Sequence, residues 1–200
     1  MSSFPDVRNT SRFPAFAACP PAEDPDLSRS YFLLGTIAEN MTVSTSPTFI
    51  LKDRSSTSFA LTLKVPADRV QAGVPGGGFD VRAFRKGFTV VVPRAKRSGV
   101  KEGKAGFVQT PSGSVQIIPA SVEKLLAMSE QAHDRAEAVG PKGWCQGCRE
   151  VREWEALSRC RGCESVWYCN KECQAQGWSE QGHRSECKVF QAVSQVFPKE

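Results

Sequence analysis

The sequence has no run of the roughly 18 apolar residues that a membrane-spanning helix needs, so we expect no membrane span. Its N-terminus also lacks the charged start and the following apolar run of a secretory signal. Both absences favour an intracellular protein in a reducing compartment, where cysteine thiols stay free.

Recognisable catalytic groups are missing as well. The sequence shows no paired carboxylates for acid–base work and no nucleophile with a neighbouring histidine. The glycines at 76–78 lack the following Lys-Ser or Lys-Thr of a phosphate-binding P-loop, and we interpret residues 73–78 as a flexible loop. We therefore predict a protein that is not an enzyme and has no small-molecule substrate.

Cysteine, in contrast, is concentrated in one stretch. Seven of the eight cysteines and one of the two histidines fall within residues 145–187. Two C-x2-C pairs can each direct both thiolates at one ion, and two further pairs are four residues apart, which on a helix places both side chains on one face. The eight potential ligands suit two tetrahedral zinc ions with none left over: Cys145, Cys148, Cys160, Cys163, Cys169, Cys173, His183 and Cys187.

Two questions about this stretch have alternative answers. Disulfide bonds would have to pair the remaining Cys19 with the cluster, and no secretory context supports them, so metal is the favoured interpretation. Spacing does not decide which ligands share an ion. A sequential division would join the first four ligands along the chain. An interleaved division would join the first pair to the third and the second pair to the fourth.

The stretch resembles a MYND zinc finger in the Tyr168-Cys169 pair, the Cys173-Gln174 pair and Trp178. Four residues separate Trp178 from His183, where family members often have two, and this difference could shift Trp178 relative to the second zinc. A RING finger also interleaves two zincs, but its single histidine falls in the middle of the motif, whereas here it is the seventh of eight ligands. The resemblance implies the interleaved arrangement, with Cys145, Cys148, Cys169 and Cys173 on one zinc and Cys160, Cys163, His183 and Cys187 on the other.

MYND fingers bind short proline-containing peptides of partner proteins, and the resemblance implies the same use here. Gln174 and Trp178 stand at the positions of the family's peptide-contacting pair; without a peptide they would be a surface amide and a packing indole. A peptide laid along a short strand edge would gain backbone hydrogen bonds, while an aromatic wall holds its prolines. In one family a MYND finger accompanies a SET methyltransferase domain, but nothing in this sequence resembles that domain.

The N-terminal region divides into a tail and a strand-rich segment. Residues 1–28 are rich in proline and predict a disordered or loosely docked tail, in which Phe4, Phe13 and Phe16 could dock onto the next domain or a partner. Residues 29–119 resemble an OB-fold barrel; another small barrel or sandwich is the alternative. The expected elements are strands at 31–39, 48–53, 58–65 and 86–92, a helical turn at 79–85, and a hairpin of residues 105–110 and 114–118.

The likeness to OB folds implies an alternative function, the binding of single-stranded nucleic acid by a basic groove with stacking aromatics. Residues 82–104 carry eight basic residues against one acid. Arg94, Lys96, Arg97 and Lys101 are the candidate phosphate contacts. A solvated loop beside core phenylalanines would account for the same pattern.

Helical periodicity over residues 120–138, ended by Gly140 and Pro141, predicts a helix that leads into the finger. We place the helix and linker at 120–139, the finger at 140–190 and a tail at 191–200. Residues 189–196 could extend the helix that carries His183 and Cys187. The sequence thus predicts an intracellular adaptor, with the nucleus slightly favoured over the cytoplasm, in which an OB-like barrel is joined to a two-zinc finger that recruits a partner protein.

Overall fold

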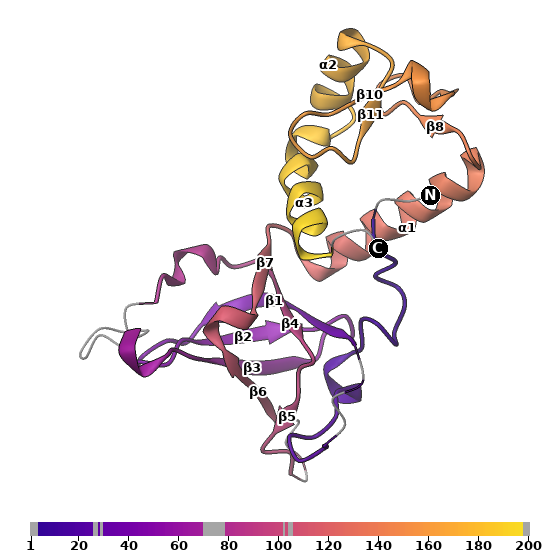
Figure 1. Cartoon of the computed structure of the whole chain (residues 1–200). Coiled ribbons are helices and arrows are strands. Elements are labelled where there is room, and N and C mark those ends of the chain that lie inside the picture. The colour runs from indigo at the N-terminus through magenta and orange to yellow at the C-terminus, as the bar shows by residue number, and fades with distance from the viewer. Residues whose placement is uncertain are drawn as a thin grey trace. The chain divides into compact units, whose positions relative to one another are not determined.

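The computed structural model describes residues 4–25, 28, 30–69, 79–101, 103 and 106–197. The chain divides into two compact units (Figure 1): Val7–Leu125, and Leu126–Glu200 together with Met1–Asp6. The flexible loop predicted at residues 73–78 lies outside the described residues. None of the described helices is long and apolar enough to cross a membrane.

The first unit, Val7–Leu125, is built on a seven-stranded sheet. Its strand order is β5-β6-β3-β2-β1-β4-β7, and neighbours are antiparallel except for the parallel pair β3 and β6. Short 3-10 turns accompany it at Phe16–Ala18, Ala67–Arg69, Val81–Ala83 and Ser112–Ser114. The strands are β1 Phe32–Asn40, β2 Thr48–Lys52, β3 Ser58–Lys64, β4 Thr89–Pro93, β5 Arg97–Ser98, β6 Phe107–Pro111 and β7 Gln116–Ile118.

The core of this unit follows the two-residue period of its strands. In β3 the side chains of Phe59, Leu61 and Leu63 are buried, as the alternation predicts. Part of the N-terminal segment completes this core: the ring of Phe16 stacks on that of Phe59, with centroids 4.4 Å apart and planes 4° from parallel. The backbone N–H of Phe16 also donates to the carboxylate of Asp53, at 2.7 Å.

The prediction of an OB-fold barrel is not supported. The described strands form an open sheet whose edge strands, β5 and β7, do not pair with each other. The hairpin predicted from residues 105–118 is wrong, because β6 pairs with β3 and β5 whereas β7 pairs with β4. Alternation along a strand reveals which side chains are buried, but not which strands are neighbours.

The sheet is nevertheless curled. In the strand order, β6 and β7 are five positions apart, which in a flat sheet would be about 24 Å at about 4.8 Å per step. The chain passes from Pro111 at the end of β6 to Gln116 at the start of β7 in five residue steps, which reach at most about 19 Å. Curling of the sheet brings the two strands within that reach.

The second unit, Leu126–Glu200 with Met1–Asp6, contains most of helix α1 (Val122–Val139) and all of the finger. The Ser121 hydroxyl oxygen accepts the backbone N–H of Lys124 at 3.2 Å and caps the start of α1. Gly140, in a left-handed conformation (φ 59°), follows the end of α1. Helix α1 matches the predicted helix to within two residues at each end. The finger contains the strand pairs β8 Gly143–Trp144 with β9 Val151–Arg152 and β10 Ser158–Arg159 with β11 Trp167–Tyr168, a 3-10 turn at Trp154–Ala156, and the helices α2 Lys171–Ser179 and α3 His183–Val196.

Helix α3 continues beyond the ligands that begin it. Val189 and Val193 lie about one and two turns after Glu186, and both are buried. The expected extension of this helix over residues 189–196 is therefore confirmed. The domain limits expected at residues 119, 139 and 190 stay predictions.

Candidate metal centres

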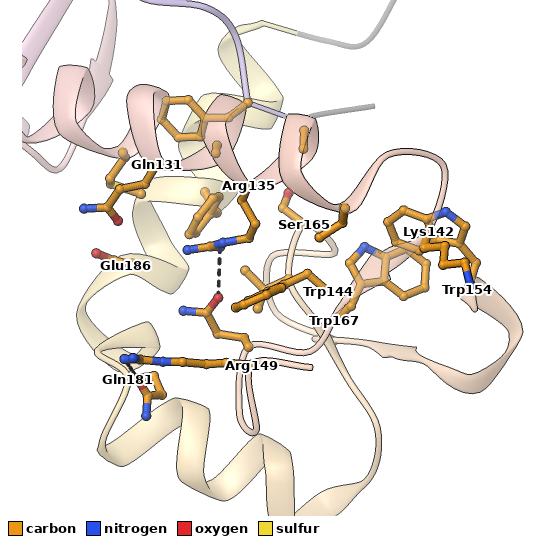
Figure 2. A pocket seen from close by; sticks show the side chains of 18 of the residues that line it. Gln131, Arg135, Lys142, Trp144, Arg149, Trp154, Ser165, Trp167, Gln181 and Glu186 are labelled. Atoms are coloured by element: carbon orange, nitrogen blue, oxygen red, sulfur yellow. Dashed lines mark hydrogen bonds between the residues drawn. The ribbon is translucent and has the colours of Figure 1, made fainter. Parts of the chain in front are cut away.

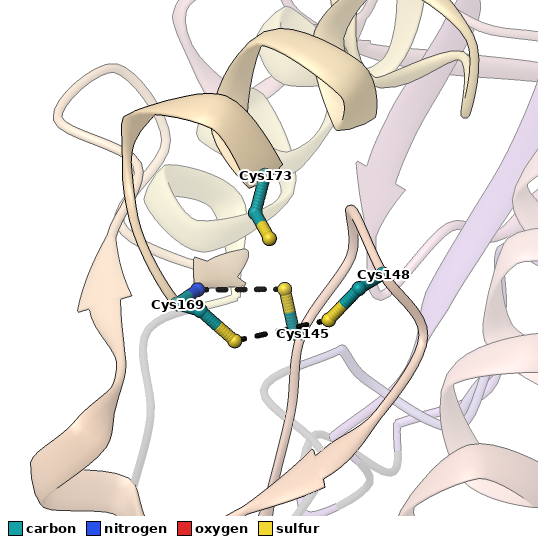
Figure 3. A group of neighbouring side chains, drawn as sticks. All are labelled: Cys145, Cys148, Cys169 and Cys173. Atoms are coloured by element: carbon teal, nitrogen blue, oxygen red, sulfur yellow. Dashed lines mark hydrogen bonds between the residues drawn. The ribbon is translucent and has the colours of Figure 1, made fainter.

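The first group of ligands, called here the first tetrad, consists of Cys145, Cys148, Cys169 and Cys173 (Figure 3). Cys145 directly follows β8, and Cys169 directly follows β11. Cys173 lies in the first turn of α2. The four sulfur atoms lie within 4.8 Å of one another, and those of Cys148 and Cys169 are 3.8 Å apart.

The second group, called here the second tetrad, consists of Cys160, Cys163, His183 and Cys187. Cys160 directly follows β10, while His183 and Cys187 lie one turn apart at the start of α3. The Cys160 and Cys187 sulfurs are 3.9 Å apart, and His183 Nε2 lies 3.6 Å from the Cys163 sulfur. All four side chains are buried.

These distances fit zinc. In a tetrahedral site with Zn–S bonds of about 2.3 Å, two sulfurs lie about 3.8 Å apart. A sulfur and an imidazole nitrogen bound at about 2.0–2.1 Å lie about 3.6 Å apart. The three distances given above match these values, and His183 Nε2 lies slightly closer, 3.3 Å, to the Cys160 sulfur. Each tetrad thus has the donor set and a spacing suited to one zinc ion.

The two tetrads are interleaved along the chain, as the resemblance implies, and the sequential division is excluded. The two ligand pairs with four-residue spacing differ in their secondary structure, however. Cys169 lies before Asn170, whose side chain caps α2 by accepting the backbone N–H of Cys173 at 2.9 Å. The pair Cys169 and Cys173 therefore has one ligand at a strand end and one on a helix, whereas His183 and Cys187, with the same four-residue spacing, both lie on α3.

The protein backbone favours the ligand form of Cys145. Burial raises the pKa of its thiol, but hydrogen bonds from the backbone N–H groups of Cys148 and Cys169, from the Cys148 side chain and from the Gly147 N–H together outweigh burial and bring the pKa to about 7. The N–H of Cys169, for example, lies 3.4 Å from the Cys145 sulfur. Because thiolate is the metal-binding form of cysteine, these hydrogen bonds prepare the site for zinc.

Burial lowers the pKa of His183, while the nearby Glu186 raises it. The net lowering favours the neutral imidazole, which is the form that binds metal. Its Nε2 faces the cysteines of the second tetrad, and its buried Nδ1 has no hydrogen-bond partner among the described residues.

Gly147 and Gly162 lie inside the two C-x2-C turns. A Cβ on Gly147 would lie 2.3 Å from the backbone oxygen of Cys173, and one on Gly162 would lie 3.0 Å from the Cys187 sulfur. Glycine is thus required at both positions because the Cys173 backbone and the Cys187 sulfur lie too close for a Cβ. The left-handed positions of these turns are Arg149 (φ 62°) and Glu164 (φ 54°).

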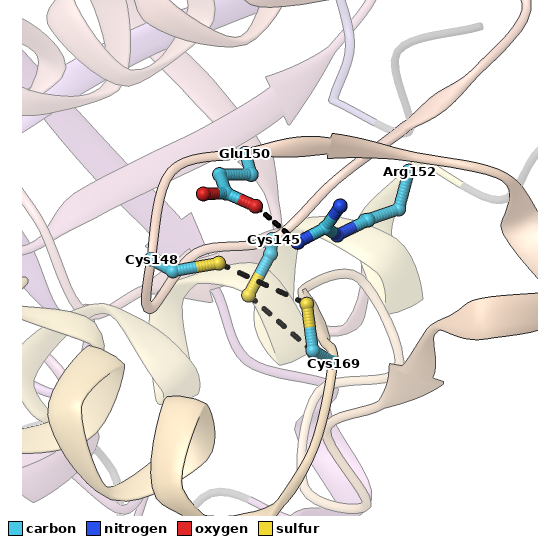
Figure 4. A network of polar contacts seen from close by, with 5 residues as sticks. All are labelled: Cys145, Cys148, Glu150, Arg152 and Cys169. Carbon is cyan, nitrogen blue, oxygen red and sulfur yellow. Dashed lines mark hydrogen bonds and ion pairs between the residues drawn. The ribbon is translucent and has the colours of Figure 1, made fainter.

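Arg152 in β9 is a residue that the sequence analysis missed. Figure 4 shows its guanidinium beside the first tetrad, where it also contacts Glu150. A hydrogen bond with Cys169 is the largest cause that raises the pKa of Arg152, followed by the charge of Glu150. A zinc ion held by four thiolates keeps an excess of two negative charges, so a neighbouring cation stabilises it.

We expect Arg152→Gln to speed the release of the first zinc without preventing its binding. Loss of a partner outside the ligand shell typically costs about 10–100-fold in metal affinity, and we expect the lower end because Arg152 is exposed. Zinc transfer to a colorimetric chelator measures the release. Arg159→Gln is the matched control, because Arg159 is likewise the exposed second residue of a two-residue strand. Equal release from the two variants would contradict the role of Arg152.

The candidate peptide-contacting residues lie together on α2. Gln174 and Trp178 are one helical turn apart, and both are exposed, Trp178 by 40%. The Trp178 ring packs edge-on against the ring of His183, with centroids 5.7 Å apart. The four residues between Trp178 and His183 therefore leave the indole in contact with the second tetrad.

The four candidate nucleic-acid contacts belong to the unit Val7–Leu125 and differ in their surroundings. Lys96 donates to the backbone oxygen of Asp24. Arg97 donates to the backbone oxygen of Cys19 at 2.7 Å, and its guanidinium lies over the ring of Phe16. These two cations thus hold the N-terminal segment against the sheet, whereas Arg94 and Lys101 are exposed.

Comparison with known proteins supports the finger alone. The family model described as MYND finger matches residues 145–187. The chain is 32% identical over 50 residues to a SET and MYND domain-containing protein of Dictyostelium discoideum (25% of this chain, 9% of the relative). It is 41% identical over 46 residues to a histone-lysine N-methyltransferase of Arabidopsis thaliana (23% and 8%) and 35% identical over 71 residues to an N-lysine methyltransferase of Gallus gallus (35% and 15%).

The chain thus spans 15% or less of the length of each of these three relatives. No solved structure shows a significant match to the chain. Residues 145–187 form a MYND finger, which is a protein-interaction module, with two interleaved tetrads suited to two zinc ions.

Proposed function

We propose that this chain is a non-enzymatic adaptor that recruits a partner protein through its MYND finger, by binding a short proline-containing peptide. The eight ligands support a structural role for both metals, because two complete tetrads leave neither zinc an open position for water or substrate. The methyltransferase names belong to relatives that match this chain over 71 residues or fewer.

The observation that carries the proposal is the exposed pair Gln174 and Trp178. An indole that is 40% exposed offers a flat apolar surface for a proline ring, and an amide one turn away can hydrogen-bond the peptide backbone. Helix α2 is held at one end by Cys173 of the first tetrad, and Trp178 contacts His183 of the second. The pair is thereby fixed in place by both metal sites.

A strand edge near the metal sites could pair with a peptide bound in an extended conformation. Strand β11 pairs with β10 on one side and forms a bridge from Trp167 to Cys145 on the other. Strand β10 therefore lies at an edge, with no second strand partner among the described residues, and its residues Ser158 and Arg159 are exposed. A bound peptide could add to this edge through backbone hydrogen bonds.

The test is a binding comparison with matched peptides. Labelled octapeptides that each contain two or three prolines are titrated with the zinc-loaded full chain, and anisotropy is measured beside the same peptides with alanine at each proline. We expect proline peptides to bind at least tenfold more tightly than their alanine versions. Equal affinities for the two sets would overturn the proposal, because the site would then not recognise proline.

Single-stranded nucleic-acid binding by the first unit stays a prediction. Lys96 and Arg97 already bind the N-terminal segment, so only Arg94 and Lys101 of the four candidates are exposed in the described structure. No observation favours this function over peptide binding.

A further inference from the structure

A cleft of about 650 Å³ lies within the second unit, between α1 and the finger (Figure 2). This volume is in the range of about 300–1,000 Å³ that is typical of ligand sites. Its described lining includes neither Gln174 nor Trp178, so it is separate from the proposed proline site. Helix α1 lines it with one face, made of Met128, Gln131, Ala132, Arg135, Ala136 and Val139.

The cleft is long. Its lining runs along α1 from Met128 to Gly140, twelve residue steps that span about 18 Å at about 1.5 Å per residue. An extended peptide rises about 3.3 Å per residue, so five or six residues would occupy this length. The shape therefore suits a stretch of extended chain better than a compact molecule.

Aromatic side chains form much of the lining of the cleft. Trp144, Trp154 and Trp167 are three of the four tryptophans of the chain, and all three line the cleft. The Trp154 and Trp167 rings meet edge to face, 5.0 Å apart, and Trp154 Nε1 donates to the backbone oxygen of Pro141 at 2.7 Å. Phe4 precedes Pro5, whose backbone oxygen accepts the Ser129 hydroxyl of α1, and its ring packs edge-on against that of Phe190 with centroids 5.7 Å apart. These rings offer fixed apolar surfaces for side chains of a bound peptide.

The middle of the cleft is cationic. Figure 2 shows the guanidinium of Arg135 extending from α1 toward the finger, where Nη1 donates to Gln146 Oε1 at 3.1 Å. The guanidinium also lies over the Trp144 ring, 5.6 Å from its centroid. Arg149 reaches the same region from the finger and donates to Gln181. A guanidinium carries five N–H donors, so each arginine has donors beyond these hydrogen bonds.

The charges in the cleft do not balance. Its described lining carries three cations, Arg135, Lys142 and Arg149, against one anion, Glu186. Lys142 pairs with Glu153 at 2.7 Å, which leaves two arginines against one carboxylate in the lining, that of Glu186. Burial lowers the pKa of Arg135; the charge of Glu186 opposes this, and the charge of Arg149 lowers the pKa further. Arg135 is partly buried and Arg149 is exposed. An incoming carboxylate between the two guanidiniums would offset their mutual repulsion.

We propose that this cleft binds an extended acidic segment of a partner protein, with a carboxylate on Arg135 and Arg149 and an apolar side chain against the tryptophans. The charge of the lining selects the acidic residue, and the rings select its apolar neighbour. The finger would then contact partners through two separate surfaces, of which the α2 surface takes proline and the cleft takes an acidic segment. The cleft assignment does not depend on the proline site.

The test uses an array of immobilised octapeptides in which two acidic residues stand at every spacing from one Leu, Phe or Trp. A second array carries lysine at each acidic position. Both are probed with the zinc-loaded full chain, and the strongest binders are labelled for anisotropy with wild type, Arg135→Gln and Arg184→Gln. Arg184 is the matched control because it is an exposed arginine of α3 that does not line the cleft. Native mass spectrometry verifies that each variant holds two zincs.

We expect binding to the acidic array alone, a loss of affinity of at least tenfold for Arg135→Gln, and less than a twofold change for Arg184→Gln and Trp178→Ala. Equal binding to the lysine array, no binding to either array, or equal effects of the two arginine variants would overturn the proposal. Complete competition by an equal concentration of N-acetyl-leucine would assign the cleft to a small anion and exclude a peptide. Self-association that Arg135→Gln abolishes would assign it to a second copy of this chain.

Discussion

Cys163→Ser is expected to remove one zinc and to unfold the part of the finger that the second tetrad holds. Cys163 is buried, and its tetrad joins the loop after β10 to the start of α3. Four of the seven buried residues in the core of the finger are ligand cysteines, so metal coordination replaces a hydrophobic core there. Structural zinc contributes about 10–16 kcal/mol in small fingers, far more than the apolar remainder of this core could supply.

Native mass spectrometry of the full chain measures the zinc count, and hydrogen exchange measures which amides lose protection. We expect one zinc at most and fast exchange in β10, β11 and the first turns of α3. Cys19→Ser is the matched control, since Cys19 is also buried but belongs to neither tetrad. It should keep two zincs. A Cys163→Ser protein that also retains two zincs would show that the ligand assignment is wrong.

Trp178→Ala is expected to weaken the binding of proline peptides at least tenfold while both zincs remain. The exposed indole is the apolar surface that we assign to the proline ring. Its edge-on contact with His183 contributes about 0.5–1.5 kcal/mol, which is small beside the free energy of zinc binding. Trp178→Ala should therefore lose peptide binding while both metal sites remain intact.

Trp154→Ala is the matched control for this variant. Trp154 is exposed to a similar extent, 37% against 40%, but lies in the cleft beside α1. It should change proline-peptide affinity by less than twofold. Equal losses of proline-peptide affinity in the two variants would contradict the assignment of the proline site to α2. Loss of zinc from Trp178→Ala would show that the indole has a structural role.

The metal sites were accessible to sequence reasoning because coordination chemistry constrains residue type and spacing together. The C-x2-C pairs at Cys145 and Cys160 identify ligands without any knowledge of the fold. The family resemblance was needed to assign the ligand pairs to two ions, because the spacing within a pair does not show which two pairs bind the same zinc. Cys169 shows the limit of spacing, since Asn170 begins a helix cap between two ligands that are four residues apart.

Other parts of the structure depend on contacts that local patterns do not contain. Alternation in residues 58–64 revealed the buried face of β3, but β3 pairs in parallel with β6, which lies more than 40 residues later. The cleft was missed for a similar reason. Arg135 looks like one more polar residue of an amphipathic helix, and only the packing of α1 against the finger places it over Trp144 and near Arg149.

The most direct measurement is the indole N–H region of a ¹H–¹⁵N spectrum of the zinc-loaded full chain during titration with a proline peptide. The chain has four tryptophans, of which Trp178 lies on α2 and the other three line the cleft. We predict that the Trp178 resonance shifts with the added peptide, together with the side-chain amide of Gln174. Shifts confined to Trp144, Trp154 and Trp167, or no shift at all, would contradict the recruitment of proline peptides through α2.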